Sequence, residues 1–433
     1  MSSRTILRLQ RELLDIGRSP ENQLFVAYND DNVKHIHALI TGPLETPYSL
    51  GMFDFSIICG DDYPTGPPKV TAMTTSNGKV RFNPNIYATG KICLSLLGTW
   101  RGEAGEQWSS AHGILSVLIS IQSLMSDKPY TNEPGFENPS PADQKYIDEY
   151  NKKIMHETLR VSVCDRLETY LGWKSNDVRV DNTSIARHYC TCRERSPFED
   201  LCKRMFLLYY DNYISIVDDE SAKVKDGNLF TRMRFEGGSN SMEGTFAYGS
   251  IRKRLESIYK GLLDEIESWK RDSIAHIKAD TTTASNIRSQ YDQIRNSKDH
   301  NGNISIELHE KNPFTWDITV FGLPATAHDG ALYKAEMVFA DSFPEVHPRV
   351  RFLSEVFHPN ISRDGFPYYR TTRDDDIRSH LTAVAKLFTQ DPDPQPAARL
   401  NMKAAQMYYG SKEEKRDYNR RVRRLAQKSV DDE

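Results

Sequence analysis

An ordered set of residues occurs twice in this sequence, and this repeat restricts the fold more than any other feature. The first copy is framed by Gly42 and Pro64 and the second by Gly322 and Pro344, so the two frames share a length of 22 positions at an offset of 280 residues. Each closing proline is followed four residues later by another proline, and then by a valine. Chance can supply one such match but not an ordered series. The chain is therefore predicted to contain two copies of one domain.

The repeat continues into a turn rich in asparagine. In the first copy, Asn83–Ile86 reads Asn-Pro-Asn-Ile and is followed by Gly90. In the second, His358–Ile361 reads His-Pro-Asn-Ile and is followed by Gly365. The offset is 275 residues at this point, so the second copy is expected to have one shorter loop.

Apolar periodicity predicts that each copy is a mixed α+β domain. The sequence alternates over 34–42 and 51–58, which is typical of half-buried antiparallel strands. Residues 109–125 have the length and apolar density of a buried helix, and 142–172 are expected to form a long amphipathic helix. A helix is also expected at the N-terminus, with these residues on its buried face: Ile6, Leu9, Leu13 and Ile16.

The predicted organisation has three parts. Residues 1–150 form the first domain, 151–284 a mostly helical extension and linker, and 285–433 the second domain. Within the middle part, 196–219 and 250–269 are predicted helices. We expect a tandem arrangement with a different segment between the copies.

Composition excludes several classes of protein. The chain has 56 basic and 60 acidic residues and a net charge of −4, which argues against general nucleic-acid binding. No apolar run approaches the roughly 20 residues that span a bilayer, so no membrane segment is expected. The six scattered cysteines do not suggest a disulfide framework. We expect a cytoplasmic or nuclear protein without a signal peptide.

The first copy carries a motif with chemical meaning. The turn ending in Asn85 is followed by Gly90 and then by Cys93-Leu94. This arrangement resembles the catalytic signature of the ubiquitin-conjugating enzymes, with Asn83 in place of the usual histidine. The segment 62–70, "DYPTGPPKV", and the pair Trp108-Ser109 resemble two further family elements.

Several other stretches are similar to one branch of that family. They include "FNPN", "CLSLLGTW", "SVLISIQSLM" and "PYTNEPGFE". The branch has extended C-termini and includes enzymes that carry ubiquitin or a related modifier, as well as the conjugating domain of a giant inhibitor-of-apoptosis protein. The resemblance covers about residues 4–270.

The resemblance implies both a fold and an activity. Each copy would contain a helix, a four-stranded antiparallel sheet, the cysteine-bearing segment or its counterpart, and further helices. Cys93 would accept ubiquitin or a ubiquitin-like protein as a thioester from an activating enzyme in an ATP-dependent pathway. It would then pass the modifier to a lysine of a protein substrate, alone or with a ubiquitin ligase. No cofactor is implied.

Thioester exchange requires a reachable nucleophilic sulfur that is also a good leaving group, and a cysteine such as Cys93 is the residue type that can provide both. A neutral carboxamide nearby, that of Asn85, can donate to the oxyanion of the tetrahedral intermediate or hold the turn in place. The alternatives are a buried structural thiol and an asparagine that only caps its own turn. We expect the Cys93 sulfur to be open to solvent beside the Asn85 carboxamide.

Partner surfaces are implied by the same resemblance. Arg4, Arg8 and Arg11 form a basic face on the first helix, which family members offer to the acidic surface of the activating enzyme. A solvated helix face is the alternative. Thr65 and Ser110 occupy positions where family enzymes commonly show ligases an aromatic residue and a nearby proline, and both are absent here. This argues against recruitment of ordinary RING-type ligases.

The acceptor side and the second copy are less regular. Asp127, Asn132 and Glu133 lie in the loop that flanks the cysteine in the family, and Asn132 stands where a carboxylate is often found. The group that activates the lysine is left open.

In the second copy Tyr368 follows Asn360 by eight residues, as Cys93 follows Asn85. A phenol with a pKa near 10 cannot serve as a transferable thioester site, so the second copy is predicted to be catalytically dead.

Two other functions are considered. In a non-catalytic adaptor, one or both domains would bind ubiquitin-like proteins or partner enzymes, and Cys93 would be vestigial. In a cysteine hydrolase, Cys93 would work with His112, a pairing supported only by the residue types. The first-ranked prediction is an active conjugating enzyme.

Two further signals are set aside. His188, Cys190, Cys192 and Cys202 could suggest zinc, but their spacing matches no closed structural site, so no metal is predicted. The basic segment 412–428 contains mixed charges and is interpreted as a solvated helix rather than an RNA-binding one.

Overall fold

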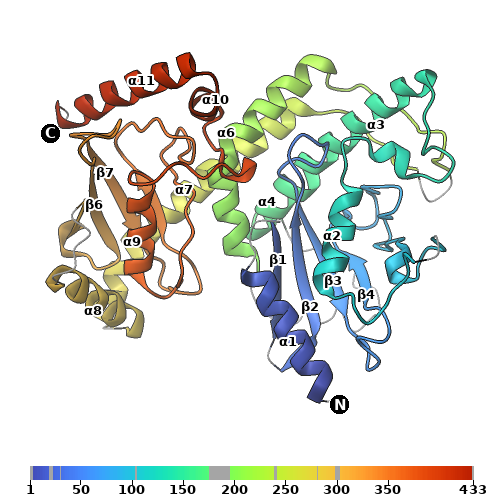
Figure 1. Cartoon of the computed structure of the whole chain (residues 1–433), viewed down its shortest axis with the longest axis horizontal. Coiled ribbons are helices and arrows are strands. Elements are labelled where there is room, and N and C mark those ends of the chain that lie inside the picture. The colour runs from blue at the N-terminus through green and yellow to red at the C-terminus, as the bar shows by residue number, and fades with distance from the viewer. Residues whose placement is uncertain are drawn as a thin grey trace. The chain divides into compact units, whose positions relative to one another are not determined.

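The computed structural model describes residues 3–18, 23–29, 31–102, 105–174, 196–237, 241–279, 281–297 and 303–431. The chain packs as two units, and Figure 1 shows the elements of each. The first comprises Met1–Cys202 and Tyr213–Ile258, and the second Lys203–Asn212 and Tyr259–Glu433. None of the described helices has the length and hydropathy that a bilayer crossing requires.

The sheet of the first unit confirms the predicted antiparallel strands. Its order is β1-β2-β3-β4, and every neighbouring pair is antiparallel. Along the central pair, Ala38 lies opposite Phe55 and Ile40 opposite Phe53, and all four side chains are buried in the core. The strands are β1 (Leu24–Asn29), β2 (Asn32–Thr41), β3 (Met52–Ile58) and β4 (Lys69–Ala72).

Helix α1 (Ser3–Arg18) lies along this sheet, as Figure 1 shows in dark blue. The predicted apolar face is buried at Leu9, Leu13 and Ile16. The same helix also reaches the start of α2 (Ile114–Leu124), because the Glu12 carboxylate accepts a hydrogen bond from the Ile114 amide at 2.9 Å. A carboxylate at a helix N-terminus satisfies an otherwise unpaired amide and complements the helix dipole.

Short helical turns and a long helix follow the sheet. They are η2 (Ser95–Leu97), η3 (Pro129–Asn132), η4 (Pro141–Asp143) and α3 (Gln144–Glu157). The single helix predicted over 142–172 is instead interrupted: α3 leads into the π-helical η5 (Thr158–Asp165) and then into α4 (Arg166–Tyr170). Six of the eight residues of η5 are buried, so this stretch has no one-sided apolar face from which periodicity could have indicated its helix type.

The extension packs on strand β3 and the loop before it. Buried Arg166 donates to the Asp54 carboxylate at 2.5 Å, and also to the Met52 carbonyl and the Thr74 hydroxyl, each at 2.9 Å. Two longer helices, α6 (Glu199–Lys223) and α7 (Tyr248–Lys278), contribute residues to both units.

The second unit repeats the sheet, and its order is β5-β6-β7-β8 with antiparallel neighbours throughout. Trp316, Ile318 and Val320 of β6 are buried in its core. The strands are β5 (Ile304–Leu308), β6 (Thr315–Phe321), β7 (Leu332–Val338) and β8 (Arg349–Phe352). The helices that start in this unit are α8 (Thr282–Asn296), η7 (His309–Lys311), α9 (Ile377–Lys386), η8 (Pro396–Ala398), α10 (Met402–Tyr409) and α11 (Lys412–Asp431).

The repeated glycines explain why the two frames match. A Cβ atom on Gly42 would lie 1.8 Å from the Tyr48 carbonyl oxygen, and one on Gly322 would lie 1.6 Å from that of His328. Each glycine is therefore required by the same close approach of a loop to the end of a strand. The predicted fold class, two α+β domains with a helical middle segment, is confirmed.

Gly51 provides a test of how the extension packs on the first domain. A Cβ atom there would lie 2.6 Å from Thr158 Cγ2 and 2.7 Å from Ser162 Oγ, both buried in η5. Gly51→Ala is therefore expected to lower the free energy of unfolding by about 1–3 kcal/mol. Gly17→Ala is the matched control: no heavy atom lies within 4 Å of its added Cβ. We expect it to raise stability by about 0.5–1 kcal/mol, as for Gly to Ala in a helix. Urea unfolding followed by circular dichroism measures both, and unchanged stability of Gly51→Ala would contradict this packing.

Candidate active site

Cys93 and Asn85 are held together by reciprocal hydrogen bonds. The Cys93 amide donates to the Asn85 carbonyl at 2.9 Å, and the Asn85 side-chain amide donates to the Cys93 carbonyl at 3.0 Å. A bridge between Ile86 and Ile92 closes the same loop. The structure thus brings together the two residues that the sequence singled out for catalysis, although they lie eight positions apart.

The thiol is less open than the sequence analysis expected. Cys93 retains only 5% of its accessible surface, so the expectation of an open sulfur is wrong for this conformation. The Tyr87 phenol lies near Cys93, and burial together with the nearby Cys93 raises the pKa of Tyr87. Cys93 nevertheless lies outside the cluster of side chains that forms the hydrophobic core.

Other described cysteines have a different environment. Cys59 belongs to the hydrophobic core of the first unit, and Cys164 is fully buried in η5. Burial raises the pKa of each of these two thiols to about 12. A thiol that stays protonated at neutral pH is a poor nucleophile, so both are structural residues.

Asn83, which replaces the family's histidine, is a buried hydrogen-bonding centre. Its side-chain amide donates to the Tyr48 hydroxyl at 3.0 Å and to the Leu124 carbonyl at 2.8 Å. Its side-chain oxygen accepts the Asn85 amide at 2.9 Å and the Asn132 side-chain amide at 3.4 Å. Because both donors and the acceptor are used, the turn that carries Asn85 is anchored from three directions.

Asn85 supports this turn and keeps spare hydrogen-bonding capacity. One hydrogen of its amide serves the Cys93 carbonyl, which leaves the second available. Its side-chain oxygen is buried and has no hydrogen-bond partner among the described residues. The geometry fits the turn-supporting role directly, and donation to an oxyanion stays a prediction.

Arg81 and Tyr87 belong to the site although sequence reasoning did not single them out. The Arg81 guanidinium donates to the Pro84 carbonyl at 2.5 Å and to the Glu133 carboxylate at 3.1 Å. It also lies 4.4 Å from the centre of the Tyr87 ring. The sequence signal for Tyr87 was its position two residues after Asn85, but its closeness to Cys93 depends on how the loop folds back.

The three acceptor-loop residues have different surroundings. Glu133 reaches the site through Arg81, and burial raises the pKa of its carboxyl group while Arg81 opposes that rise. Asn132 turns inward, donating to the Leu124 carbonyl at 3.0 Å. Asp127 is exposed, and its backbone carbonyl accepts from Asn151 at 2.7 Å. Glu133 is therefore the acid of this loop with a contact to the active-site turn.

The predicted basic face of α1 is only partly free. Arg8 pairs with Glu12 and donates to the His112 carbonyl at 3.3 Å, so it serves packing between helices. Arg11 is exposed. Arg4 lies in the first turn of α1, and its side chain is outside the described part of the chain.

Thr65 and Ser110 are both exposed on adjoining loops. The Trp108 indole donates to the Pro64 carbonyl at 2.9 Å, and this bond ties the loop before α2 to the loop after β3. The structure therefore brings together the two positions that resemble the family's ligase-contact surface.

His112 is engaged away from Cys93. Its Nδ1 accepts the Ser109 amide at 3.0 Å, and its ring centre lies 5.7 Å from that of Trp108. These contacts place it at the start of α2 and give no support to a Cys93–His112 hydrolase pair.

Three of the four zinc candidates, His188, Cys190 and Cys192, lie outside the described residues. The fourth, Cys202, is fully buried in α6. Over the described ranges, no group of three or more His, Cys, Asp or Glu side chains is arranged to hold a metal ion.

The second copy reproduces the turn without the nucleophile. The Tyr368 amide donates to the Asn360 carbonyl at 2.8 Å, which matches the Cys93–Asn85 backbone bond. The Tyr368 phenol accepts from the Arg370 guanidinium at 2.9 Å. The Asn360 carboxamide forms hydrogen bonds with a neighbouring loop: it donates to the Ala398 carbonyl at 2.8 Å and accepts from the Asp393 amide at 2.8 Å. Tyr368 therefore has the same backbone hydrogen bond to its turn as Cys93 has.

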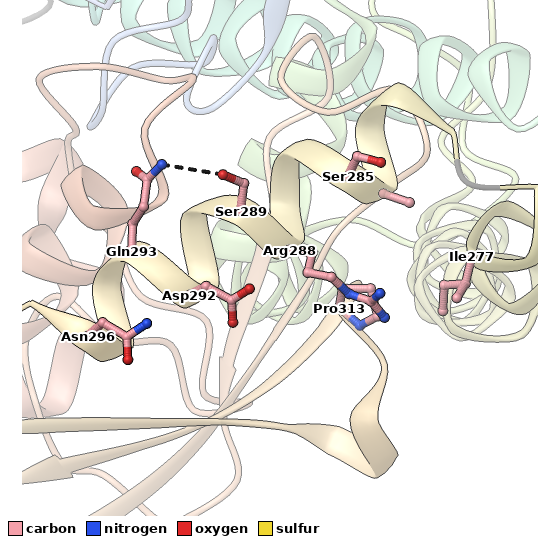
Figure 2. A pocket seen from close by; sticks show the side chains of 9 residues that line it. Ile277, Ser285, Arg288, Ser289, Asp292, Gln293, Asn296 and Pro313 are labelled. Atoms are coloured by element: carbon pink, nitrogen blue, oxygen red, sulfur yellow. Dashed lines mark hydrogen bonds between the residues drawn. The ribbon is translucent and has the colours of Figure 1, made fainter.

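A cavity of about 550 Å³ beside α8 lies in the second unit. Figure 2 shows polar side chains along one face of the helix, and among them Gln293 donates to the Ser289 hydroxyl at 3.3 Å. Arg288, Asp292 and Asn296 on this face are exposed. The cavity is a surface depression that contains neither turn described above.

Comparisons with known proteins find matches for both copies of the repeat. The family model described as ubiquitin-conjugating enzyme matches residues 8–158 and 286–426. Human ubiquitin-conjugating enzyme E2 Z is 40% identical over 264 residues, which cover 61% of this chain and 65% of that protein. The Danio rerio protein of the same name is 43% identical over 234 residues, covering 54% of this chain and 68% of that protein.

A third relative is much longer. The human dual E2 ubiquitin-conjugating enzyme/E3 ubiquitin-protein ligase BIRC6 is 39% identical over 168 residues, covering 37% of this chain and 4% of that protein. The chain thus spans 65% of the human E2 Z protein and a small part of BIRC6. Because the family model matches both copies and more than half of the chain, this protein belongs to the ubiquitin-conjugating enzyme family and carries the family's domain twice.

Proposed function

We propose that the first unit accepts ubiquitin or a ubiquitin-like protein as a thioester on Cys93 and transfers it to a substrate lysine. The observation that carries this proposal is the pairing of Cys93 with Asn85 in a turn anchored by buried Asn83. Membership of the ubiquitin-conjugating enzyme family supports the same reaction class.

The first step exchanges one thioester for another. The Cys93 thiolate attacks the modifier's terminal carbonyl carbon, a carbon–sulfur bond forms, and the activating enzyme's thiolate leaves. No oxidant or reductant takes part. Since Cys93 is only 5% exposed before it carries a modifier, the side chains around it, Tyr87 among them, must move aside when the acyl group arrives.

The second step moves the acyl group to an amine. The neutral lysine nitrogen attacks the thioester carbon, the oxyanion forms, and the Cys93 thiolate leaves as the amide forms and the nitrogen loses a proton. The second amide hydrogen of Asn85 is the proposed donor to that oxyanion. Glu133 is the proposed group that attracts the lysine ammonium and takes its proton, because it is the acceptor-loop acid that contacts the active-site turn through Arg81.

Partner surfaces follow from exposure. We propose that the activating enzyme contacts α1 through the exposed Arg11, with Arg4 as a further contact that the family resemblance implies, and that any ligase contacts the joined loops carrying Thr65 and Ser110. Arg8 is the weakest of the predicted contacts because Glu12 already pairs with it. The second copy is proposed to be non-catalytic because Tyr368 replaces the nucleophile.

The thioester prediction concerns Cys93 directly. Incubation of the full chain with activating enzyme, ATP and a modifier should give an adduct on a non-reducing gel that a thiol reductant removes. Cys93→Ala should abolish the adduct, and Cys93→Ser should give at most a reductant-resistant ester. Tyr368→Phe is the control and should charge like the wild type. A folded wild-type chain that forms no reductant-sensitive adduct with any modifier and activating enzyme tested would overturn the proposal.

The Glu133 prediction is a pH dependence. Because burial raises the pKa of this carboxyl group, its ionised form is lost at a higher pH than that of an ordinary glutamate as the pH falls. As the pH falls, discharge of Cys93-bound modifier to free lysine should therefore decline more steeply than protonation of the lysine alone explains. Glu133→Gln should remove this additional acid limb and slow discharge about a hundredfold at neutral pH. Glu137→Gln, an exposed carboxylate in the same loop, should leave the limb unchanged. An unaltered pH profile for Glu133→Gln would exclude this role.

A further inference from the structure

We propose that the helical extension of the first unit positions the active-site turn through a buried relay that runs from α6 and η5 into the loop 46–51 and through Tyr48 to Asn83. Tyr213 and Tyr48 are then positioning residues of the transfer reaction. The link to transfer rests on the function proposed above, whereas the link to the geometry around Cys93 does not.

The Tyr48 hydroxyl connects the loop to the turn. Tyr48 is fully buried, and its hydroxyl donates to the Phe82 carbonyl at 2.6 Å while it accepts the Asn83 side-chain amide at 3.0 Å. Its donor and one acceptor site therefore serve the two residues that open the Asn-Pro-Asn turn. A buried hydroxyl bonded on both sides fixes the relative position of the segments it joins.

The loop that carries Tyr48 cannot shift alone. The Gly51 amide donates to the Tyr48 carbonyl at 2.9 Å, and the Leu50 amide donates to the Gly42 carbonyl at 3.2 Å. Gly42 approaches the Tyr48 carbonyl so closely that a side chain there would overlap it. A displacement of this loop is therefore passed to the Tyr48 ring.

The extension holds the same loop from outside. The Thr158 hydroxyl of η5 donates to the Pro47 carbonyl at 3.1 Å, and the Tyr213 hydroxyl of α6 donates to the Leu50 carbonyl at 2.8 Å. Both donors are fully buried. Two backbone carbonyls on either side of Tyr48 thus take their hydrogen bonds from the extension, and their loss would leave buried acceptors unsatisfied.

The second copy has a different arrangement at the equivalent positions. His328 replaces Tyr48, and its ring nitrogen pairs with the Tyr333 hydroxyl at 2.9 Å rather than with the turn residue His358. The loop lies against α11, where the Leu332 amide donates to the Ser429 hydroxyl at 3.0 Å. The hydroxyl link between loop and turn is therefore found in the copy that has the nucleophile.

The matched variants are Tyr213→Phe and Tyr209→Phe, both on α6. Each removes one buried hydroxyl that donates to a backbone carbonyl: the Tyr213 bond to Leu50 is 2.8 Å and belongs to the first unit, whereas the Tyr209 bond to Ala397 is 2.6 Å and belongs to the second. Both variants should therefore lower the free energy of unfolding by similar amounts. Tyr48→Phe tests the next link of the relay.

The first measurement is the rate at which iodoacetamide alkylates Cys93 in the full chain. Peptide mass spectrometry at successive times measures how much of Cys93 is alkylated. Because Cys93 is only 5% exposed, a loosened turn should make its thiol more accessible. Tyr213→Phe and Tyr48→Phe are expected to react about three- to tenfold faster than the wild type, the range set by one lost hydrogen bond. Tyr209→Phe is expected to react at the wild-type rate. Equal rates for Tyr213→Phe and Tyr209→Phe would overturn the relay.

The second measurement is single-turnover discharge to lysine, combined in a double-mutant cycle with Asn85→Ala. Tyr213→Phe should slow discharge about fivefold in the wild-type background and much less in Asn85→Ala, because both changes act on the same turn. Additive effects, or the same loss in Tyr209→Phe, would indicate a merely structural role and reject the relay. If the wild type accepts no modifier, the proposed function fails, and the alkylation rates still decide the relay.

Discussion

The rest of the active site depends on the hydrogen bonds made by the buried side-chain carboxamide of Asn83. A carboxamide has two donors and an oxygen that can accept two hydrogen bonds, whereas a neutral imidazole has one donor and one acceptor. In the first copy Asn83 uses this capacity to hold Tyr48, Leu124, Asn85 and Asn132. In the second copy His358 accepts the Asn360 amide and bonds the Leu387 backbone. The replacement of histidine by asparagine therefore adds partners to the turn rather than weakening it.

Around this anchor, charge and cover are divided among residues that come from different parts of the chain. Tyr87 lies near Cys93, and Arg81 pairs with the half-buried Glu133 and packs on the Tyr87 ring. The extension holds the neighbouring loop that carries Tyr48. Before it carries a modifier, Cys93 is only 5% exposed and is therefore protected from adventitious oxidation and alkylation, since both reactions need access to the thiolate. The site is therefore consistent with a nucleophile that is uncovered when its partner docks. The second copy keeps the scaffold but places the Tyr368 phenol and the Arg370 guanidinium at the corresponding position.

The sequence was sufficient to predict the features that depend on local spacing. The repeat, the apolar face of α1, the antiparallel strands and the pairing of Cys93 with the Asn85 turn all follow from short-range patterns, and the structure contains them. Contacts made by folding distant segments together were not predictable in this way. Glu12 at the start of α2, Arg81 against Glu133 and Tyr48 beneath Asn83 join residues 102, 52 and 35 positions apart. The open sulfur was wrongly expected because the burial of Cys93 depends on how the loop folds around it, which local spacing does not show.

The proposed function depends on whether Cys93 carries the modifier. The most direct measurement is peptide mapping of the full chain by mass spectrometry under non-reducing conditions, after reaction with activating enzyme, ATP and a modifier. The peptide that contains Cys93 should be acylated, and hydroxylamine should remove the acyl group. The peptides that contain Cys59, Cys164 and Tyr368 should be unmodified. Acylation at one of those other residues, in a chain that circular dichroism shows to be folded, would contradict the proposed function.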